Sequence, residues 1–125
     1  MIIRLWVTGL FPSRAENYDK FANSRSLHMF RTLDGCEGVL FIRSETQGYV
    51  FSFWRDVDAI EALSKSDLYQ QTVKEIVAAG FLSEPQTVEL VNVTGGFLAH
   101  NAMQFLRSLS IDLGAQEIRL VGEPR

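Results

Sequence analysis

The spacing of apolar and polar positions along the chain predicts six elements in the order strand, helix, strand, strand, helix, strand. Residues 2–11, IIRLWVTGLF, are rich in β-branched and aromatic types and predict the first strand. Ser13, with Glu16 three residues later, is typical of a capping box, in which each side chain satisfies a backbone N–H left free at a helix start. We therefore expect a helix from here to about Thr32, followed by Gly35 in a left-handed conformation.

The next two strands form the most apolar part of the chain. Residues 38–44, GVLFIRS, and 48–54, GYVFSFW, are separated by a polar stretch and predict a hairpin, in which Gly48 is expected to supply a positive φ. A strand with one solvated face alternates apolar and polar residues, whereas residues 49–54 are apolar at almost every position. Both faces of this strand are therefore expected to be covered.

A second helix and a fourth strand complete the pattern. Asp56 precedes apolar residues at helical spacing and is expected to cap the helix, which restarts at residues 64–67, SKSD, and ends near Gly80. The segment 86–93, QTVELVNV, follows Pro85 and predicts the last strand of the domain.

This order of elements is that of the split βαβ unit, which predicts an α+β, ferredoxin-like fold with a four-stranded antiparallel sheet and both helices on one face. The opposite face would meet water in an isolated copy, although VLFI and YVFSFW are apolar on both sides. We therefore expect a homodimer in which two sheets pack face to face as a dimeric α/β barrel.

Gly95 and Gly96 divide the chain into a domain of residues 1–94 and a C-terminal extension of residues 95–125. In the extension, residues 97–110, FLAHNAMQFLRSLS, place apolar side chains on one helical face, and QEIRLVGEP predicts a short final strand. The apolar face of this helix is expected to dock on the barrel or on the partner subunit.

Composition narrows the class of protein. Hydrophobic residues make up 46% and charged residues 22% of the 125 residues, which is typical of a folded, soluble domain. The net charge of −3 offers no basic excess for nucleic acid, and no apolar run reaches the length of a membrane span. Cys36 is the single cysteine, and the N-terminus lacks the pattern of a signal peptide, so a cytoplasmic location is expected.

The chain resembles the antibiotic biosynthesis monooxygenase superfamily of dimeric α+β barrels over residues 1 to about 94. The likeness lies in LDGCEGVLFIR at the turn into the second strand, FSFW at the end of the third strand, and DAIEALSKSDLY in the following helix. The superfamily includes cofactor-independent oxygenases of quinols and anthrones, haem degraders and proteins without known activity. The resemblance therefore specifies the fold better than the reaction.

Haem degradation is disfavoured, because the chain lacks residues that are typical of the haem-degrading branch of the superfamily. In that branch, a histidine seven residues after the serine of the SD pair binds iron, and the corresponding residue here is Val73. The asparagine that the branch carries on its first strand is also missing from the WVTG stretch. We therefore expect no haem, no metal and no other cofactor.

Arg25 and His28 are the candidate catalytic residues. At about 100° per residue, the apolar residues of the first helix define one face, and Arg25 falls in the middle of it. It either reaches the rim and pairs with a carboxylate, or points into a polar cavity where its guanidinium holds a phenolate or carboxylate. His28 lies at the edge of the same face, where it is either a surface histidine or the base that takes a proton from a phenol or quinol.

Four aromatic residues are candidates for substrate binding. Trp54 ends a core strand, where it either packs under the next helix or forms an aromatic wall for a planar substrate. Tyr18, Tyr49 and Tyr69 can each donate a hydrogen bond to a ligand in a cavity, although tyrosines are also common at the edge of a core.

Cys36 is not expected to be a nucleophile, because no histidine or basic residue stands beside it in sequence to lower its pKa. The two histidines, His28 and His100, are too far apart for a metal motif.

Two functions follow from these observations. The first, implied by the resemblance, is a cofactor-independent monooxygenase of a small aromatic quinol or polyketide-like phenol, with Arg25 as binder, His28 as base and Trp54 as wall. The second is a non-catalytic small-molecule-binding or structural dimer of the same fold. Many superfamily members carry a histidine soon after the tryptophan, and its absence here favours the second function, whereas the polar residues of the first helix favour the first.

Overall fold

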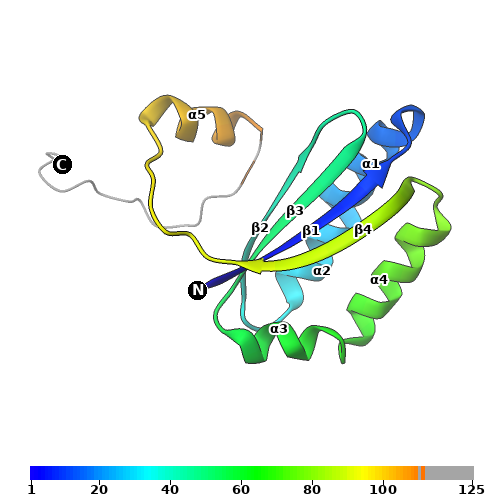
Figure 1. Ribbon diagram of the computed structural model, residues 1–125, viewed down its shortest axis with the longest axis horizontal. Coiled ribbons are helices and arrows are strands. Elements are labelled where there is room, and N and C mark those ends of the chain that lie inside the picture. The colour runs from blue at the N-terminus through cyan, green and yellow to red at the C-terminus, as the bar shows by residue number, and fades with distance from the viewer. Residues whose placement is uncertain (110, 112–125) are drawn as a thin grey trace, which may run out of the picture. The chain divides into compact units, whose positions relative to one another are not determined.

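The computed structural model describes residues 1–109 and residue 111, and the chain divides into two compact units, Met1–Val93 and Thr94–Arg125. The first unit contains a sheet and four α-helices (Figure 1). Its strands and α-helices in chain order are β1 (Ile2–Leu10), α1 (Ala15–Phe21), α2 (Leu27–Thr32), β2 (Cys36–Arg43), β3 (Gln47–Trp54), α3 (Val57–Leu63), α4 (Asp67–Ala78) and β4 (Leu82–Val91).

The sheet confirms the predicted fold class. Its strand order is β2-β3-β1-β4, and every neighbouring pair is antiparallel. The helices of this unit lie on one face of the sheet, as Figure 1 shows. The chain therefore has an α+β, ferredoxin-like fold in which β1 lies inside the sheet and presents one of its faces to the helices.

The first helical stretch extends to Thr32 as predicted, but it does not begin with the predicted capping box. Pro12–Arg14 form a 3-10 turn before α1, and no side chain caps the start of this turn or of α1. Ser13 lies inside the turn, so it is not at the position from which a capping side chain reaches the helix.

A π-helical turn, Ala22–Ser26, joins α1 to α2. In this turn the backbone N–H of Leu27 donates to the carbonyl of Ala22, five residues earlier. The wider turn shifts the buried face by one residue, so that Ser26 is buried and the side chain of Arg25 is 55% exposed. The expectation that Arg25 lies in the middle of the buried face is wrong for this reason.

β2 and β3 form the predicted hairpin. The expected positive φ at Gly48 is wrong, because the positive-φ glycines of the described residues are Gly35, Gly80 and Gly96. The first two follow the two helical regions, as predicted. A Cβ at Gly48 would lie 3.2 Å from the hydroxyl oxygen of Tyr18, so this glycine leaves room for the tyrosine beneath the sheet.

Trp54 is fully buried in the core between β3 and the helices. Its Nε1–H donates to Oγ of Ser52 at 2.8 Å, and the Ser52 hydroxyl donates to the backbone carbonyl of Arg4 at 3.2 Å. The indole donor is therefore satisfied inside the protein, as buried polar groups generally are.

The second helical region is capped at Asp56, as predicted, and a second cap stands where the helix restarts. Asp56 and Ser66, which precede α3 and α4, each accept a hydrogen bond from a backbone N–H of the first turn. β4 begins at Leu82, before Pro85 rather than after it. Pro85 is tolerated because β4 is an edge strand, where an N–H can be missing without loss of a ladder bond.

The sheet face that points away from the helices of this unit is apolar on β1, β2 and β3, and we call it the open face. Alternate residues of adjacent strands lie there in register. Its apolar members on the first three strands are Ile3, Leu5, Val7, Leu40, Ile42, Tyr49, Phe51 and Phe53.

In the second unit, the structure describes one helix, α5 (His100–Ser108), which lies within the predicted helical segment. The predicted strand QEIRLVGEP lies outside the described residues. None of the helices in the described part of the chain is long and apolar enough to cross a membrane.

Candidate functional site

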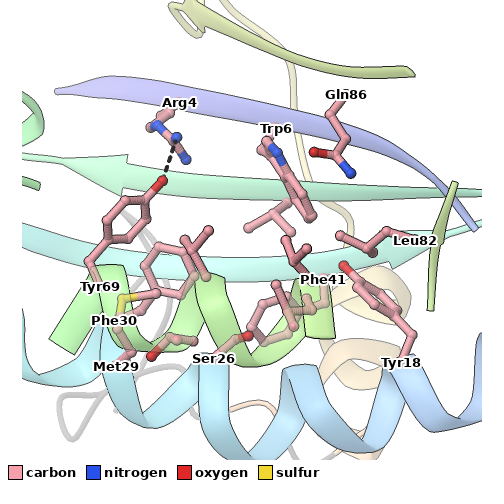
Figure 2. A pocket seen from close by; sticks show the side chains of 15 residues that line it. Arg4, Trp6, Tyr18, Ser26, Met29, Phe30, Phe41, Tyr69, Leu82 and Gln86 are labelled. Atoms are coloured by element: carbon pink, nitrogen blue, oxygen red, sulfur yellow. Dashed lines mark hydrogen bonds between the residues drawn. The ribbon is translucent and has the colours of Figure 1, made fainter. Parts of the chain in front are cut away.

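A cavity of about 110 Å³ lies between the helix-facing side of the sheet and the helices α1, α2 and α4 (Figure 2). Most of its wall is apolar or aromatic, and a few polar side chains reach it, as is usual for small-molecule sites. The lining residues with chemical consequences are Arg4, Trp6, Tyr18, Ser26, Tyr69 and Gln86.

Strand periodicity brings the sheet residues of this group together. Arg4 and Trp6 point to the same face of β1 because side chains two apart share a face. They are paired in register with Ser52 and Val50 of β3, which are buried under the helices. Gln86 belongs to the same face on β4.

Arg4 and Tyr69 form the charged end of the cavity. Nη2 of Arg4 donates to the Tyr69 hydroxyl at 3.3 Å, and the guanidinium carbon lies 5.9 Å from the centre of the tyrosine ring. Arg4 is half-buried and forms no ion pair with a carboxylate within the described part of the chain. Among the described residues, its charge faces only a neutral hydroxyl and a π face, so an oxyanion would complete the arrangement.

Tyr18 and Gln86 form a neutral end. Figure 2 shows them across the cavity from the charged end, with Trp6 between the two ends. Burial, with a smaller contribution from the Asp19 carboxylate, raises the pKa of Tyr18 to about 12. Its hydroxyl therefore stays protonated at neutral pH, and it makes no hydrogen bond within the described residues. This end of the cavity can donate a hydrogen bond to a ligand without contributing charge.

The space between the two ends is mainly aromatic. The rings of Phe30 and Phe41 lie 6.4 Å apart, centre to centre, and Trp6 adds a third aromatic surface. Ser26, turned inward by the π-helical turn, is 8% exposed, and its hydroxyl makes no hydrogen bond within the described residues. A flat apolar ligand fits such a wall, and the Ser26 hydroxyl is free to bond to it.

Of the residues proposed from the sequence, Tyr18 and Tyr69 line the cavity, one at each end. Arg25 and His28 do not line it, and both are exposed. Arg25 pairs with Glu75 of α4, with Nε 2.9 Å from Oε2, and this bond holds the pKa of the Glu75 carboxyl below its usual value. The structure therefore brings neither predicted catalytic residue into the cavity, and the ion-pair alternative describes Arg25.

Trp54 and Tyr49 also lie apart from the cavity. Trp54 is a core residue whose N–H is already bonded, which is the packing alternative stated for it. Tyr49 points to the open face of the sheet and donates to Oε1 of Gln47 at 2.8 Å. The aromatic wall of the cavity is provided by Trp6, Phe30 and Phe41 instead.

Arg4, Trp6 and Gln86 line the cavity but were not predicted from the sequence. A signal for Arg4 was present, because a lone cation in the otherwise apolar run IIRLWV of an interior strand needs a partner. For Gln86 we find no such signal, since a glutamine at the start of a strand is ordinary. Ser26 could not be found either, because the helical turn that exposes it to the cavity departs from the regular period.

None of the described lining residues is a histidine, cysteine, aspartate or glutamate. Val73, at the position that the resemblance assigns to an iron-binding histidine, does line the cavity and offers only an apolar side chain. Across the described residues, no group of three or more such side chains is placed to hold a metal ion. The polar chemistry of the cavity therefore rests on arginine, hydroxyl and amide groups.

Comparison with models of protein families finds no match, and comparison with curated proteins finds none either. Solved structures do match. A protein from Bordetella bronchiseptica, provisionally named an antibiotic biosynthesis monooxygenase, has a TM-score of 0.65 and 20% identity over 74% of this chain and 96% of its own. A protein of the same provisional name from Caulobacter crescentus has a TM-score of 0.63 and 14% identity over 75% of this chain and 90% of its own.

SnoaB from Streptomyces nogalater, a cofactor-independent oxygenase, has a TM-score of 0.59 and 13% identity in a variant form. The match covers 76% of this chain and 94% of SnoaB. Identities this low establish the fold alone. The resemblance indicated by the sequence is confirmed at that level, and the activity must be argued from the residues of this chain.

Proposed function

We propose that this chain, which has the fold of the antibiotic biosynthesis monooxygenases, is a cofactor-independent monooxygenase that acts on a single-ring phenol or quinol in the cavity beside Arg4 and Trp6. The observation that carries the proposal is the cavity, a small and mostly apolar space with aromatic walls and a cation at one end. SnoaB, a cofactor-independent oxygenase, shares the fold, which supports the reaction class.

The volume of the cavity limits the substrate. Its 110 Å³ is somewhat below the roughly 150 Å³ of an engineered cavity that binds benzene. A single ring is therefore the most that the space can enclose, and a polyketide-like phenol with several fused rings would leave most of its skeleton outside. The single-ring quinol is the better supported of the two substrates expected from the sequence.

The reaction needs no reductant beyond the substrate itself. Hydroquinone and O2 give 2-hydroxy-1,4-benzoquinone and water, with one oxygen atom of O2 in each product. The substrate supplies all four electrons, two from the quinol and two from the C–H bond that becomes C–OH. Electron transfer to O2 starts from the phenolate, and donors aimed at its oxygen stabilise that anion. Arg4 and Tyr69 are the donors available at the charged end.

Oxygen uptake with a series of single-ring hydroquinones tests the proposal. Val77 lines the cavity and is 60% exposed, so Val77→Trp should obstruct its opening without disturbing the core and should lower the rate severalfold. Val57→Trp is the matched control, because Val57 is 43% exposed and does not line the cavity. Uptake no faster than autoxidation in buffer, or an equal loss in both variants, would contradict the proposal.

Binding without turnover is the second candidate function, and one observation favours it. No carboxylate or imidazole of the described residues lines the cavity, so no side chain there can take the phenolic proton in the usual way. A protein of this kind would bind the same single-ring ligands by calorimetry and leave oxygen uptake at the buffer rate.

We also propose that the chain forms a homodimer through the open face. Ile42 is 49% exposed on that face, and no helix of the Met1–Val93 unit covers it. Burying such an apolar surface against a second copy removes it from water. Sedimentation velocity should give a dimer that persists on dilution, and Phe51→Glu should dissociate it. A folded wild-type monomer at low micromolar concentration would contradict this assembly.

A further inference from the structure

In the described part of the chain, Arg4 is a cation with no carboxylate as an ion-pair partner. It is half-buried, and within the described residues its polar side-chain contact is the neutral hydroxyl of Tyr69. Removing a guanidinium from water is costly unless hydrogen bonds and an opposite charge compensate for it. Three other arginines, Arg25, Arg43 and Arg55, each pair with a carboxylate. Arg4 lines the cavity instead, where a ligand can supply the missing charge.

The two ends of the cavity differ in charge. Arg4 and Tyr69 present donors and a positive charge, whereas Tyr18 and Gln86 present a hydroxyl and an amide. The two pairs lie across the cavity from each other, with Trp6 between them (Figure 2). A ring that spans the space carries its two polar substituents on opposite sides, which is the para arrangement.

We propose that the cavity binds a single-ring phenol as its anion, with the oxyanion at Arg4 and Tyr69 and a para substituent at Tyr18 and Gln86. This inference rests on the proposed function, because it names the ionisation state and the orientation of that substrate. It assigns Arg4 the role of substrate binding and Tyr18 and Gln86 the role of selecting the para isomer.

The absence of a described base in the cavity agrees with this assignment. The phenolic proton is released to solvent, either before binding or as the ring enters, and the bond that breaks is the O–H of the ligand. A nearby positive charge favours the ionised form of an acid. The bound phenol should therefore ionise at a lower pH than the free phenol, and affinity should rise as the free ligand becomes phenolate.

The probe for this experiment is 4-nitrophenol, whose anion absorbs visible light and whose neutral form does not. Its nitro group is a para acceptor for the Tyr18 hydroxyl and the Gln86 amide. Titration of the full chain with 4-nitrophenol across neutral pH should show at least about tenfold tighter binding of the anion than of the neutral phenol. Equal binding of the two forms overturns the proposal.

Substitutions locate the charge that is responsible. Arg4→Met keeps the apolar stem and should abolish the preference for the anion, whereas Arg4→Lys should retain part of it. Arg43→Met is the control, because Arg43 pairs with Asp19 and does not line the cavity. Thermal melting of each variant checks that it is folded. A preference for the anion that survives in folded Arg4→Met overturns the proposal.

The para arrangement has its own control ligand. 2-Nitrophenol has the same size and ionises at nearly the same pH, but its substituent points away from the far end of the cavity. It should bind severalfold more weakly than 4-nitrophenol, and Tyr18→Phe should narrow the difference. Equal affinity of the two isomers for the wild type overturns the orientation.

The outcomes separate this inference from the proposed reaction. If the anion binds at Arg4 but hydroquinones are not oxidised, the binding mode stands and the oxygenase function fails. If hydroquinones are oxidised as fast by folded Arg4→Met as by the wild type, with the same KM, the function stands and the anion site is overturned.

Discussion

Replacement of Tyr18 by phenylalanine should make the protein less sensitive to alkaline pH. Tyr18 is 2% exposed, and its burial, reinforced by Asp19, raises the pKa of the phenol from 10.0 to about 12. Phenylalanine keeps the ring and removes only a hydroxyl that makes no hydrogen bond within the described residues. The Tyr18→Phe protein should therefore be folded at neutral pH, with a stability close to that of the wild type.

The direction of the effect follows from the two pKa values. Below 10.0 the phenol is neutral in the folded and unfolded states, so its contribution to stability is fully present. Between 10.0 and about 12 the unfolded chain ionises Tyr18 while the folded chain does not, and the free energy of unfolding falls as pH rises. At roughly pH 11 the loss from this one group is about 1.4 kcal/mol.

Urea denaturation near pH 8 and pH 11 measures this contribution. The wild type should lose about 1.4 kcal/mol more than Tyr18→Phe between the two conditions. Absorbance titration of the three tyrosines provides a second measurement, because the wild type should show a late ionisation that the variant lacks. An equal loss of stability in the wild type and in Tyr18→Phe between the two pH values would contradict the raised pKa of Tyr18. It would mean that the Tyr18 hydroxyl reaches water and that the neutral end of the cavity is not shielded.

Three further substitutions test the scaffold around the cavity. Ser52→Ala should lower the free energy of unfolding, measured with urea, by about 1–3 kcal/mol, because it leaves the buried N–H of Trp54 without its acceptor. In a double-mutant cycle, Trp54→Phe should lower the free energy of unfolding less when Ser52 is already alanine. Asp56→Asn should reduce the loss of stability in acid. The backbone hydrogen bond that Asp56 accepts lowers the pKa of its carboxyl, so the stability that this bond provides is lost as pH falls through the lowered pKa. An unchanged acid denaturation curve for Asp56→Asn would contradict this. Arg25→Met should change the melting temperature little and leave 4-nitrophenol binding unchanged, because the ion pair with Glu75 is exposed and outside the cavity. A steep drop in the melting temperature or in the affinity would contradict this placement of Arg25.

The fold could be predicted because its determinants repeat along the sequence. Alternating and helical apolar patterns gave the order of elements, and the caps at Asp56 and Ser66 lie where local hydrogen bonding requires them. The capping box at Ser13 failed because a 3-10 turn precedes α1. Gly48 was assigned to a turn, although its role is to leave room for Tyr18, a residue thirty positions away that the sequence pattern does not place beside it.

The site was harder to predict because it depends on departures from regular geometry and on contacts between distant segments. A helical wheel with a uniform period turned Arg25 inward, whereas one π-helical turn moves Ser26 into that place. The cation that does line the cavity is Arg4, which meets Tyr69 across 65 positions of sequence. The pairing of residues so far apart follows from the packing of α4 against the sheet, which local pattern does not reveal.

Incorporation of labelled oxygen shows whether a single-ring quinol is oxygenated in this cavity. Hydroquinone is incubated with the purified full-length chain under 18O2, the reaction is quenched quickly to limit exchange with water, and the products are analysed by mass spectrometry. Val77→Trp and buffer without protein are run beside it. We expect a hydroxyquinone that carries one 18O atom and forms faster with the wild type than with either control. Unlabelled benzoquinone with an equal amount of hydrogen peroxide, formed at the buffer rate, would contradict it.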